Sequence, residues 1–184
     1  IGKTHFHPEG DYQFSHVEFP GYLQKPDIGC FFREKKTGRV GAEKRFEKIG
    51  LKTEESYDDK VLQSSLKWLD QHKDEDSWHL YIGFLDPHFP FYVKKENWDY
   101  FEALITEVPD ELKPPFTSLN DPLNWLRAYF KCENLPEETV RKLLIGYHCA
   151  IAELDERIGI LLDKLEELSL YDQTIFCYTS DHGE

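Results

Sequence analysis

The sequence predicts an α/β fold with a central sheet of buried, mostly parallel strands. Two short apolar runs, residues 79–85 and 173–179, have the length and the aromatic and β-branched content typical of buried strands. A helical pattern precedes each run, and a long connection separates the two. This order favours parallel pairing, because parallel strands need long crossovers whereas antiparallel strands can be joined by a short turn.

The first 86 residues divide into an irregular segment, a helix and a strand. Residues 1–55 are punctuated throughout by glycine and proline, which is typical of loops. A helix is expected over residues 56–73, with an apolar stripe formed by Val61, Leu62, Leu66 and Leu69. The strand at 79–85 should end at Asp86-Pro87, because proline cannot donate a hydrogen bond to a sheet.

Residues 87–135 are expected to form a loop-rich insertion with short helices around 98–101 and 122–129. The part from 136 to 184 should be a long helix followed by the second strand. Asn134 can cap this helix, with Pro136 in its first turn. The apolar residues repeat at alternating spacings of three and four and predict a stripe on a helix of about 30 residues: Val140, Leu144, Tyr147, Ile151, Leu154, Ile158, Leu161, Leu165 and Leu168. A coiled coil would give a similar pattern, but Gly146, Gly159 and the following strand favour packing on a sheet.

Composition excludes several classes of function. The formal net charge of −13 argues against non-specific nucleic-acid binding, which needs clustered Lys and Arg. No apolar run is long enough to span a bilayer, so no membrane partner is expected, and no leader pattern opens the sequence. The compartment stays open. The absence of methionine, together with Ile1 at the start and Glu184 at the end, leads us to expect that the native protein continues in both directions.

The cysteines and the helix acids receive ordinary structural interpretations. None of the four cysteines has C-x-x-C spacing, so a zinc or redox site is not expected. Cys149 and Cys177 are interpreted as buried free thiols. Acidic residues on the long helix, such as Glu153, are interpreted as part of a solvated face.

Two strand ends carry residues suited to chemistry, and ligands of such sheets bind at the carboxyl ends of strands. Asp181 and His182 follow the second strand and offer an oxygen and a nitrogen ligand for a divalent cation. The alternative is a capping Asp beside a surface His. His88 stands between Pro87 and Pro90, which would hold a general acid rigidly. The alternative there is a packing histidine, and Asp86 is interpreted as a turn former.

The first residues form a third cluster. In an extended segment Lys3, His5 and His7 share one face, which would attract an anionic ester and could transfer protons near neutral pH. A zinc site is the competing interpretation, but no further ligand stands at a familiar spacing. The other histidines, which are His16, His72, His79 and His148, are interpreted as structural or surface residues.

Together these segments resemble the sulfatase family of the alkaline phosphatase superfamily. Residues 1–6 (IGKTHF) resemble its G-K-x-H segment, and residues 81–91 (YIGFLDPHFPF) resemble its strand ending in P-H-x-P. Residues 147–184, which end in TIFCYTSDHGE, resemble the helix and strand before its S-D-H-G or S-D-N-G motif. The matched segments lie in the family's order. The resemblance implies that residues 1–184 are an internal portion of a catalytic domain with an alkaline-phosphatase-like α/β/α sandwich.

The resemblance also implies roles. Asp181 and His182 would bind a divalent cation, with calcium the expected ion, that neutralises the sulfate oxygens. Lys3 and His5 would contact a formylglycine nucleophile, and His88 would protonate the departing alcohol. The substrate would be a small anionic sulfate ester.

Several parts of the family pattern are missing from the sequence. The nucleophile motif C/S-x-P/A-x-R is absent, as are the N-terminal Asp-Asp metal pair and a Lys after the S-D-H-G strand. Residues 1–184 alone are therefore expected to be inactive, with formylglycine outside them. Two alternatives stay open: a phosphonate monoester or phosphodiester hydrolase of the same superfamily, and a non-catalytic family-derived interaction domain.

Overall fold

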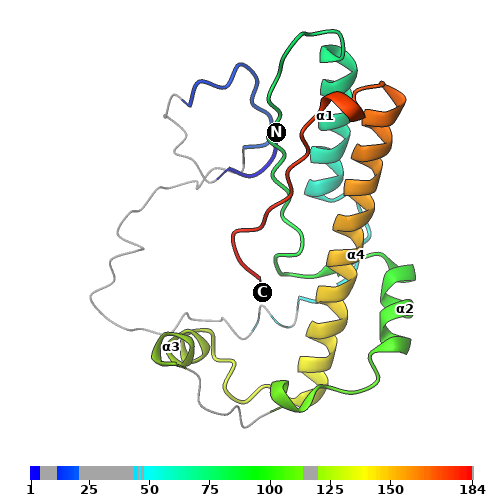
Figure 1. The fold of residues 1–184 in the computed structure, drawn as a ribbon. Coiled ribbons are helices and arrows are strands. Elements are labelled where there is room, and N and C mark those ends of the chain that lie inside the picture. Colours follow the sequence, from blue (N-terminus) through cyan, green and yellow to red (C-terminus); the bar gives the residue numbers. More distant parts are fainter. Residues whose placement is uncertain (5–11, 21–43, 45, 47, 114–119, 184) are drawn as a thin grey trace. The chain divides into compact units, whose positions relative to one another are not determined.

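A computed structural model describes residues 1–4, 12–20, 44, 46, 48–113 and 120–183. The chain forms two compact units. The first unit comprises Ile1–Pro26, Thr53–Asp86 and Glu153–Glu184, and the second comprises Asp27–Lys52 and Pro87–Ala152. Within the described residues, helices accompany a small parallel sheet, in agreement with the predicted α/β class (Figure 1).

All the predicted helices are confirmed. In chain order they are α1 (Tyr57–His72), α2 (Lys95–Leu104), α3 (Asp121–Phe130) and α4 (Glu137–Glu167). Short 3-10 turns occupy Asp110–Leu112 and Tyr171–Gln173. Because α4 begins at Glu137, Pro136 lies just before its first turn and its carbonyl accepts the Val140 N–H at 3.1 Å. Asn134 therefore lies further from the helix than predicted. No described helix has the length and hydropathy that a membrane span requires.

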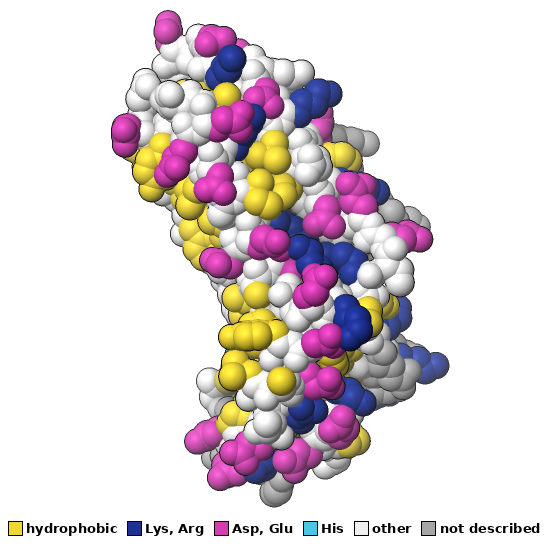
Figure 2. Space-filling view, turned by 90° about the vertical axis from the view of Figure 1, so that its right-hand side faces the viewer, with side chains coloured by type: hydrophobic (Ala, Val, Ile, Leu, Met, Phe, Trp, Pro, Cys, Tyr) yellow, Lys and Arg dark blue, Asp and Glu magenta, His cyan; other side chains and the backbone are white. Residues whose placement is uncertain are grey.

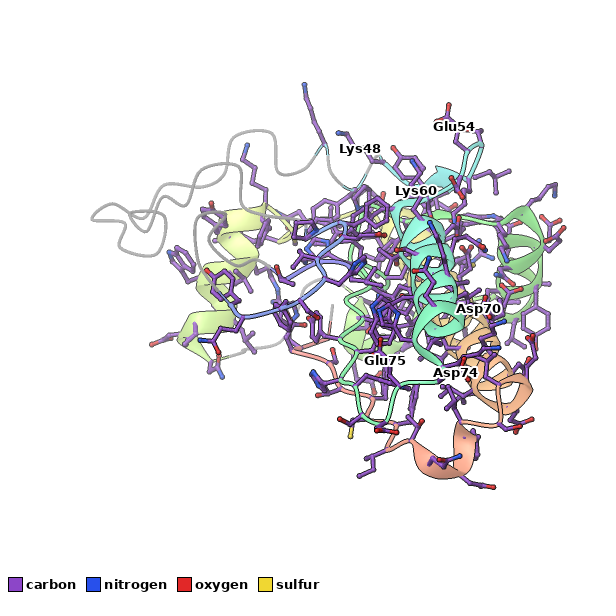
Figure 3. The ribbon with its side chains drawn as sticks, turned by 90° about the horizontal axis from the view of Figure 1, so that it is seen from above. Lys48, Glu54, Lys60, Asp70, Asp74 and Glu75 are labelled. Carbon is purple, nitrogen blue, oxygen red and sulfur yellow. The ribbon has the colours of Figure 1, made fainter. Side chains whose placement is uncertain are left out.

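The first unit is built on α1 and the C-terminal part of α4, which lie side by side in Figure 1. Ser56 and Asp59 form a capping box, in which each side chain accepts the other residue's backbone N–H at the start of α1. The apolar side chains of the two helices form the buried core of this unit, namely Val61, Leu62, Trp68, Leu69, Leu161 and Leu165 together with Ile1. Asp70, labelled in Figure 3, pairs with Lys164 of α4 at 2.7 Å.

Residues 79–85 are extended but do not form a regular strand. Leu80, Ile82 and Phe84 pack against the core of the first unit, as an alternating pattern requires. Ladder pairing is limited to one parallel bridge between Gly2 and Gly83. The predicted buried strand is therefore reduced to a single bridge, and Tyr81 and Leu85 are exposed, so burial is confirmed for one face of the segment.

The prediction of a buried strand at 173–179 is wrong for the described structure. These residues are extended and almost all exposed, with Ile175 91% accessible. A strand exists only when a neighbour accepts and donates its backbone hydrogen bonds, and no such neighbour flanks this segment among the described residues. Cys177 is exposed for the same reason, whereas Cys149 is buried and forms no disulfide with the described residues, as predicted.

The second unit contains the two-stranded parallel sheet, which the sequence did not predict. β1 (Gly50–Leu51) pairs with β2 (Tyr92–Val93) in the register Gly50 to Tyr92. The core of this unit combines residues of β2 and its flank with the N-terminal part of α4: Phe91, Val93, Ile145, Cys149 and Ala150. Arg141 of α4 holds the end of α2 through the carbonyls of Ile105 and Glu102, each at 2.9 Å. Ile151, predicted to belong to the apolar stripe, is 41% exposed.

The two glycines of α4 provide a matched pair for a stability test. A Cβ at Gly146 would lie 2.8 Å from the Phe91 Cβ, whereas a Cβ at Gly159 would meet no atom of the described residues within 4 Å. Gly146→Ala should therefore lower the free energy of unfolding by about 1–3 kcal/mol, as expected for overpacking a core. Gly159→Ala should raise it by up to about 1 kcal/mol, because alanine favours helix more than glycine does. Urea denaturation of both variants checks this, and equal effects would contradict the packing around Gly146.

Candidate active site

Lys3 is positioned by its backbone. Its N–H donates to the Gly83 carbonyl at 2.8 Å, and the Gly83 N–H donates to the Ile1 carbonyl at 2.9 Å. The segments that contain Lys3 and Gly83 approach so closely that a Cβ at Gly83 would lie 2.2 Å from the Lys3 carbonyl oxygen. Gly2 has a φ of +94°, in the region that favours glycine. The sequence Gly2-Lys3 and the glycine at 83 therefore fix where the Lys3 side chain starts.

Asp181 and His182 lie together at the end of the extended segment that follows α4, and both side chains are exposed. The Asp181 Oδ2 lies 3.5 Å from the His182 Nε2, and the Asp181 Oδ1 accepts the His182 N–H at 2.9 Å. The His182 Nδ1 lies 2.8 Å from the Gly183 carbonyl. When Nδ1 donates its proton to that carbonyl, Nε2 presents a lone pair next to the carboxylate. A proton or a cation between Nε2 and Oδ2 would satisfy both atoms.

Lys3 belongs to the same unit as Asp181, and its charge is the smallest of several contributions that lower the pKa of Asp181. Desolvation alone would raise this pKa, but the His182 N–H and the charges of His182 and Lys3 outweigh it, so the pKa lies below its ordinary value. Of the cluster Lys3, His5 and His7, the described residue Lys3 thus lies in the same unit as Asp181 and His182.

The donor chemistry of Asp181 and His182 suits part of a cation site. The carboxylate is the ligand that hard divalent cations prefer, and the imidazole adds a nitrogen donor. Within the described ranges, no group of three or more His, Cys, Asp and Glu side chains is placed to hold a metal ion. The chemistry of the two residues therefore fits a cation, but they alone could supply only part of a ligand set.

His88 lies in the second unit, in the turn between Pro87 and the cis peptide bond that joins Phe89 to Pro90. Its ring is half-buried and stacks on Phe89 with a centroid distance of 4.8 Å. The His88 Nδ1 lies 2.5 Å from the Phe89 carbonyl. A proton donated from Nδ1 to this carbonyl leaves Nε2 as the nitrogen that can exchange a proton with a substrate. His5 and His7 lie outside the described residues.

An ionic cluster around the buried Arg157 side chain, which sequence reasoning missed, stands where the extended segment 79–85 ends. Arg157 of α4 donates to Asp86 and to Asp59, each at 2.8 Å, and lies 3.6 Å from Glu153. Asp58 accepts the backbone N–H groups of Leu85 and Asp86, each at 2.8 Å. We call Asp58, Asp59, Asp86, Glu153 and Arg157 the Arg157 cluster.

The Arg157 cluster corrects two interpretations made from sequence. Glu153, interpreted as solvated, is 1% exposed, and Asp86 is an ion-pair partner as well as a turn residue. Burial alone would lower the pKa of Arg157, but its hydrogen bond to Asp59 and the charges of the neighbouring carboxylates raise it, so the guanidinium stays charged. The available signal was the i, i+4 spacing of Glu153 and Arg157 on a helix next to a strand-end aspartate.

The chain is acidic, with a formal net charge of −13, and the face drawn in Figure 2 carries side chains of both signs. Figure 2 shows Asp and Glu side chains scattered over one face, with Lys and Arg side chains between them. A local cation such as Lys3 can therefore attract an anion although the chain as a whole is acidic.

Comparison with known proteins matches this chain to sulfatases. A family model described as Sulfatase matches residues 7–184. Choline-sulfatase of Rhizobium meliloti (strain 1021) is 30% identical over 138 residues, which cover 70% of this chain and 27% of the relative. Human iduronate 2-sulfatase is 31% identical over 116 residues, which cover 56% of this chain and 21% of the relative. Rat arylsulfatase K is 30% identical over 132 residues, which cover 65% of this chain and 23% of the relative. The chain spans about a quarter of the length of these relatives.

Proposed function

Because this chain belongs to the sulfatase family, we propose that it forms part of the catalytic domain of an enzyme that hydrolyses a small sulfate monoester. The observation that supports the proposal is the carboxylate–imidazole pair of Asp181 and His182, which belongs to the same unit as one candidate cation, Lys3. This arrangement suits an anionic ester, whose charge repels a nucleophile until cations offset it. The names of the relatives, which are all sulfatases, support the same reaction class.

We assign Asp181 and His182 to a divalent cation, with calcium as the expected ion. Such a cation would act as a Lewis acid and neutralise the charge that builds up on the sulfate oxygens. Lys3 would add a second positive charge on the side of the nucleophile, and His5 would assist proton transfer there. These assignments follow the family resemblance residue by residue.

His88 is assigned as the general acid. When the S–O bond to the alcohol breaks, the electron pair stays on the alcohol oxygen, and a proton from the His88 Nε2 neutralises it. The flanking prolines and the stack on Phe89 restrict the imidazole, which reduces the freedom lost on reaching the reactive geometry. The nucleophile is expected outside residues 1–184, where a formylglycine hydrate would supply the attacking hydroxyl.

Paired assays of the whole protein that contains this chain test the proposal. With calcium present, we expect hydrolysis of an aryl sulfate and much slower hydrolysis of the matching aryl phosphonate. A preference for the phosphonate would replace the proposal with phosphonate ester hydrolysis. Inactivity on both esters would support a non-catalytic interaction domain.

Removing the cation ligand gives a more specific expectation. Asp181→Ala should weaken calcium binding to the whole protein by at least about 10- to 100-fold, a loss already typical of changes to the groups that support metal ligands. Asp172→Ala is a suitable control, because Asp172 is also exposed and stands in the same segment after α4. Isothermal titration with calcium measures both. Equal affinities for the Asp181→Ala and Asp172→Ala proteins would remove Asp181 from the ligand set.

A further inference from the structure

Arg157 joins three parts of the first unit. Its side chain is 4% exposed, and its guanidinium contacts Asp59 of α1, Glu153 of its own helix, and Asp86 at the end of the extended segment. The Nε and Nη2 groups both donate to one carboxylate oxygen of Asp59, at 3.2 and 2.8 Å, while Nη1 reaches Asp86. The planar fork of arginine makes this division possible, because its N–H groups point in fixed and different directions.

Asp86 is held from more than one side. Its side chain accepts from Arg157, and its backbone N–H donates to the Asp58 carboxylate at 2.8 Å. The preceding residue, Leu85, donates to the other oxygen of the same carboxylate. The backbone is thereby fixed where the turn Asp86-Pro87-His88 begins, and Pro87 restricts the next φ angle.

We propose that Arg157 is a positioning residue, which fixes Asp86 so that the turn leading to His88 starts in the geometry required for proton transfer to the leaving alcohol. The inference rests on the proposed function of His88 as general acid. Arg157 does not touch the substrate in this account. It acts through Asp86, two residues before the imidazole.

Stability alone is a weak reason for this cluster. Replacing a buried ion pair with packed apolar residues is often neutral or stabilising, since the desolvation of the charges offsets their attraction. What a buried ion pair does supply is a specified geometry, because a misplaced partner leaves a charge without compensation. The carboxylate that Arg157 fixes on this segment is the one next to the His88 turn, which is where geometry would matter for catalysis.

The test uses leaving groups of different acidity. General-acid help matters most for a poorly acidic alcohol, such as that of an alkyl sulfate, and little for 4-nitrophenyl sulfate, whose phenolate leaves without a proton. We expect Asp86→Asn and Arg157→Lys in the whole protein to lower kcat for the alkyl sulfate about 10- to 100-fold, in line with small misplacements of catalytic groups. The kcat for 4-nitrophenyl sulfate should fall less than about threefold, because its leaving group needs little of the general acid.

Asp86→Asn is the informative variant, because it leaves Arg157 paired with Asp59 and Glu153 and so spares the rest of the cluster. Arg141→Met is the matched control: Arg141 stands on the same helix and also holds another element, α2, through hydrogen bonds. Arg141→Met should lower the melting temperature without changing the ratio of kcat for the alkyl sulfate to kcat for 4-nitrophenyl sulfate.

The outcomes separate this inference from the function on which it rests. An equal loss on both esters, or no loss on either, in the Asp86→Asn protein would overturn the positioning role of Arg157. If His88→Gln lowers kcat equally for the alkyl sulfate and for 4-nitrophenyl sulfate, the general-acid assignment is wrong, and the positioning role of Arg157 is wrong with it. If the wild-type protein hydrolyses neither ester, the proposed function itself is overturned, and this inference with it.

Discussion

Gly83→Ala is expected to lower the free energy of unfolding of the first unit by about 3 kcal/mol or more, at the upper end of the range for overpacked sites. The added Cβ would lie 2.2 Å from the Lys3 carbonyl oxygen and 2.9 Å from the Lys3 nitrogen. Both are backbone atoms, so no side-chain rotation can relieve the overlap. The two backbone segments must separate, and the hydrogen bonds from Lys3 to Gly83 and from Gly83 to Ile1 are lost.

Gly50→Ala is the control for this prediction. Gly50 also pairs in parallel with a neighbouring segment, but a Cβ there would meet only the Tyr92 ring at 3.8 Å, an ordinary contact. This variant should keep its stability or gain up to about 1 kcal/mol, since alanine reduces the freedom of the unfolded chain. Urea denaturation gives the two free energies, and hydrogen exchange of the Lys3 and Gly83 amides locates the loss. Unchanged protection of these amides in the Gly83→Ala protein would contradict the parallel bridge.

Gly83→Ala should also affect the candidate site. Lys3 starts from the backbone that Gly83 holds, and its charge contributes to the lowered pKa of Asp181. Separation of the segments that contain Lys3 and Gly83 would therefore move the Lys3 ammonium away from the Asp181 carboxylate. The stability of the Gly2–Gly83 bridge and the electrostatics of the site are linked through one residue.

The helices could be predicted from sequence because their signals are local. The stripe of Val61, Leu62 and Leu69 and the cap at Ser56 lie within the helix or next to it. Each stripe can be detected without knowledge of what it packs against. The boundaries of α1 and α4 accordingly agree with prediction to within a few residues.

The strands were less predictable because a strand depends on residues distant in the sequence. Residues 173–179 have a strand-like composition, yet no described neighbour pairs with them, and Ile175 and Cys177 are exposed. Conversely, β1 and β2 pair within segments whose glycines and prolines indicated loops. Apolar composition indicates that a segment can be buried, but it does not identify the partner that buries it.

The candidate site could be predicted in its residue types but not in its supporting interactions. Asp181, His182 and Lys3 were singled out because carboxylates, imidazoles and amines carry chemistry. Arg157 and Glu153 were missed because charged residues on a helix are mostly exposed, so the ordinary expectation pointed to solvent. Their burial follows from their partners, above all Asp86 and Asp59, which come from other parts of the chain.

His88→Gln should give the largest loss of activity, with kcat for an alkyl sulfate about 10²- to 10⁴-fold below wild type, as expected for removal of a general acid. This corresponds to about 3–5 kcal/mol of transition-state stabilisation, at 1.36 kcal/mol for each factor of ten. Glutamine keeps a polar side chain of similar length but cannot donate a proton to the departing oxygen as an acid. The alcohol must then leave as an unprotonated alkoxide, which is unfavourable for a weakly acidic alcohol.

A series of sulfate esters with leaving alcohols of increasing acidity would measure this effect as a slope. The rate of the His88→Gln protein should depend steeply on the acidity of the alcohol, whereas the rate of the wild-type protein should depend on it weakly. His79→Ala is the control, since His79 is exposed and is the first residue of the same extended segment. Parallel slopes for the wild-type and His88→Gln proteins would show that the imidazole between Pro87 and Pro90 does not protonate the leaving group, because a lost proton donor must be felt most by the alcohols that need it most.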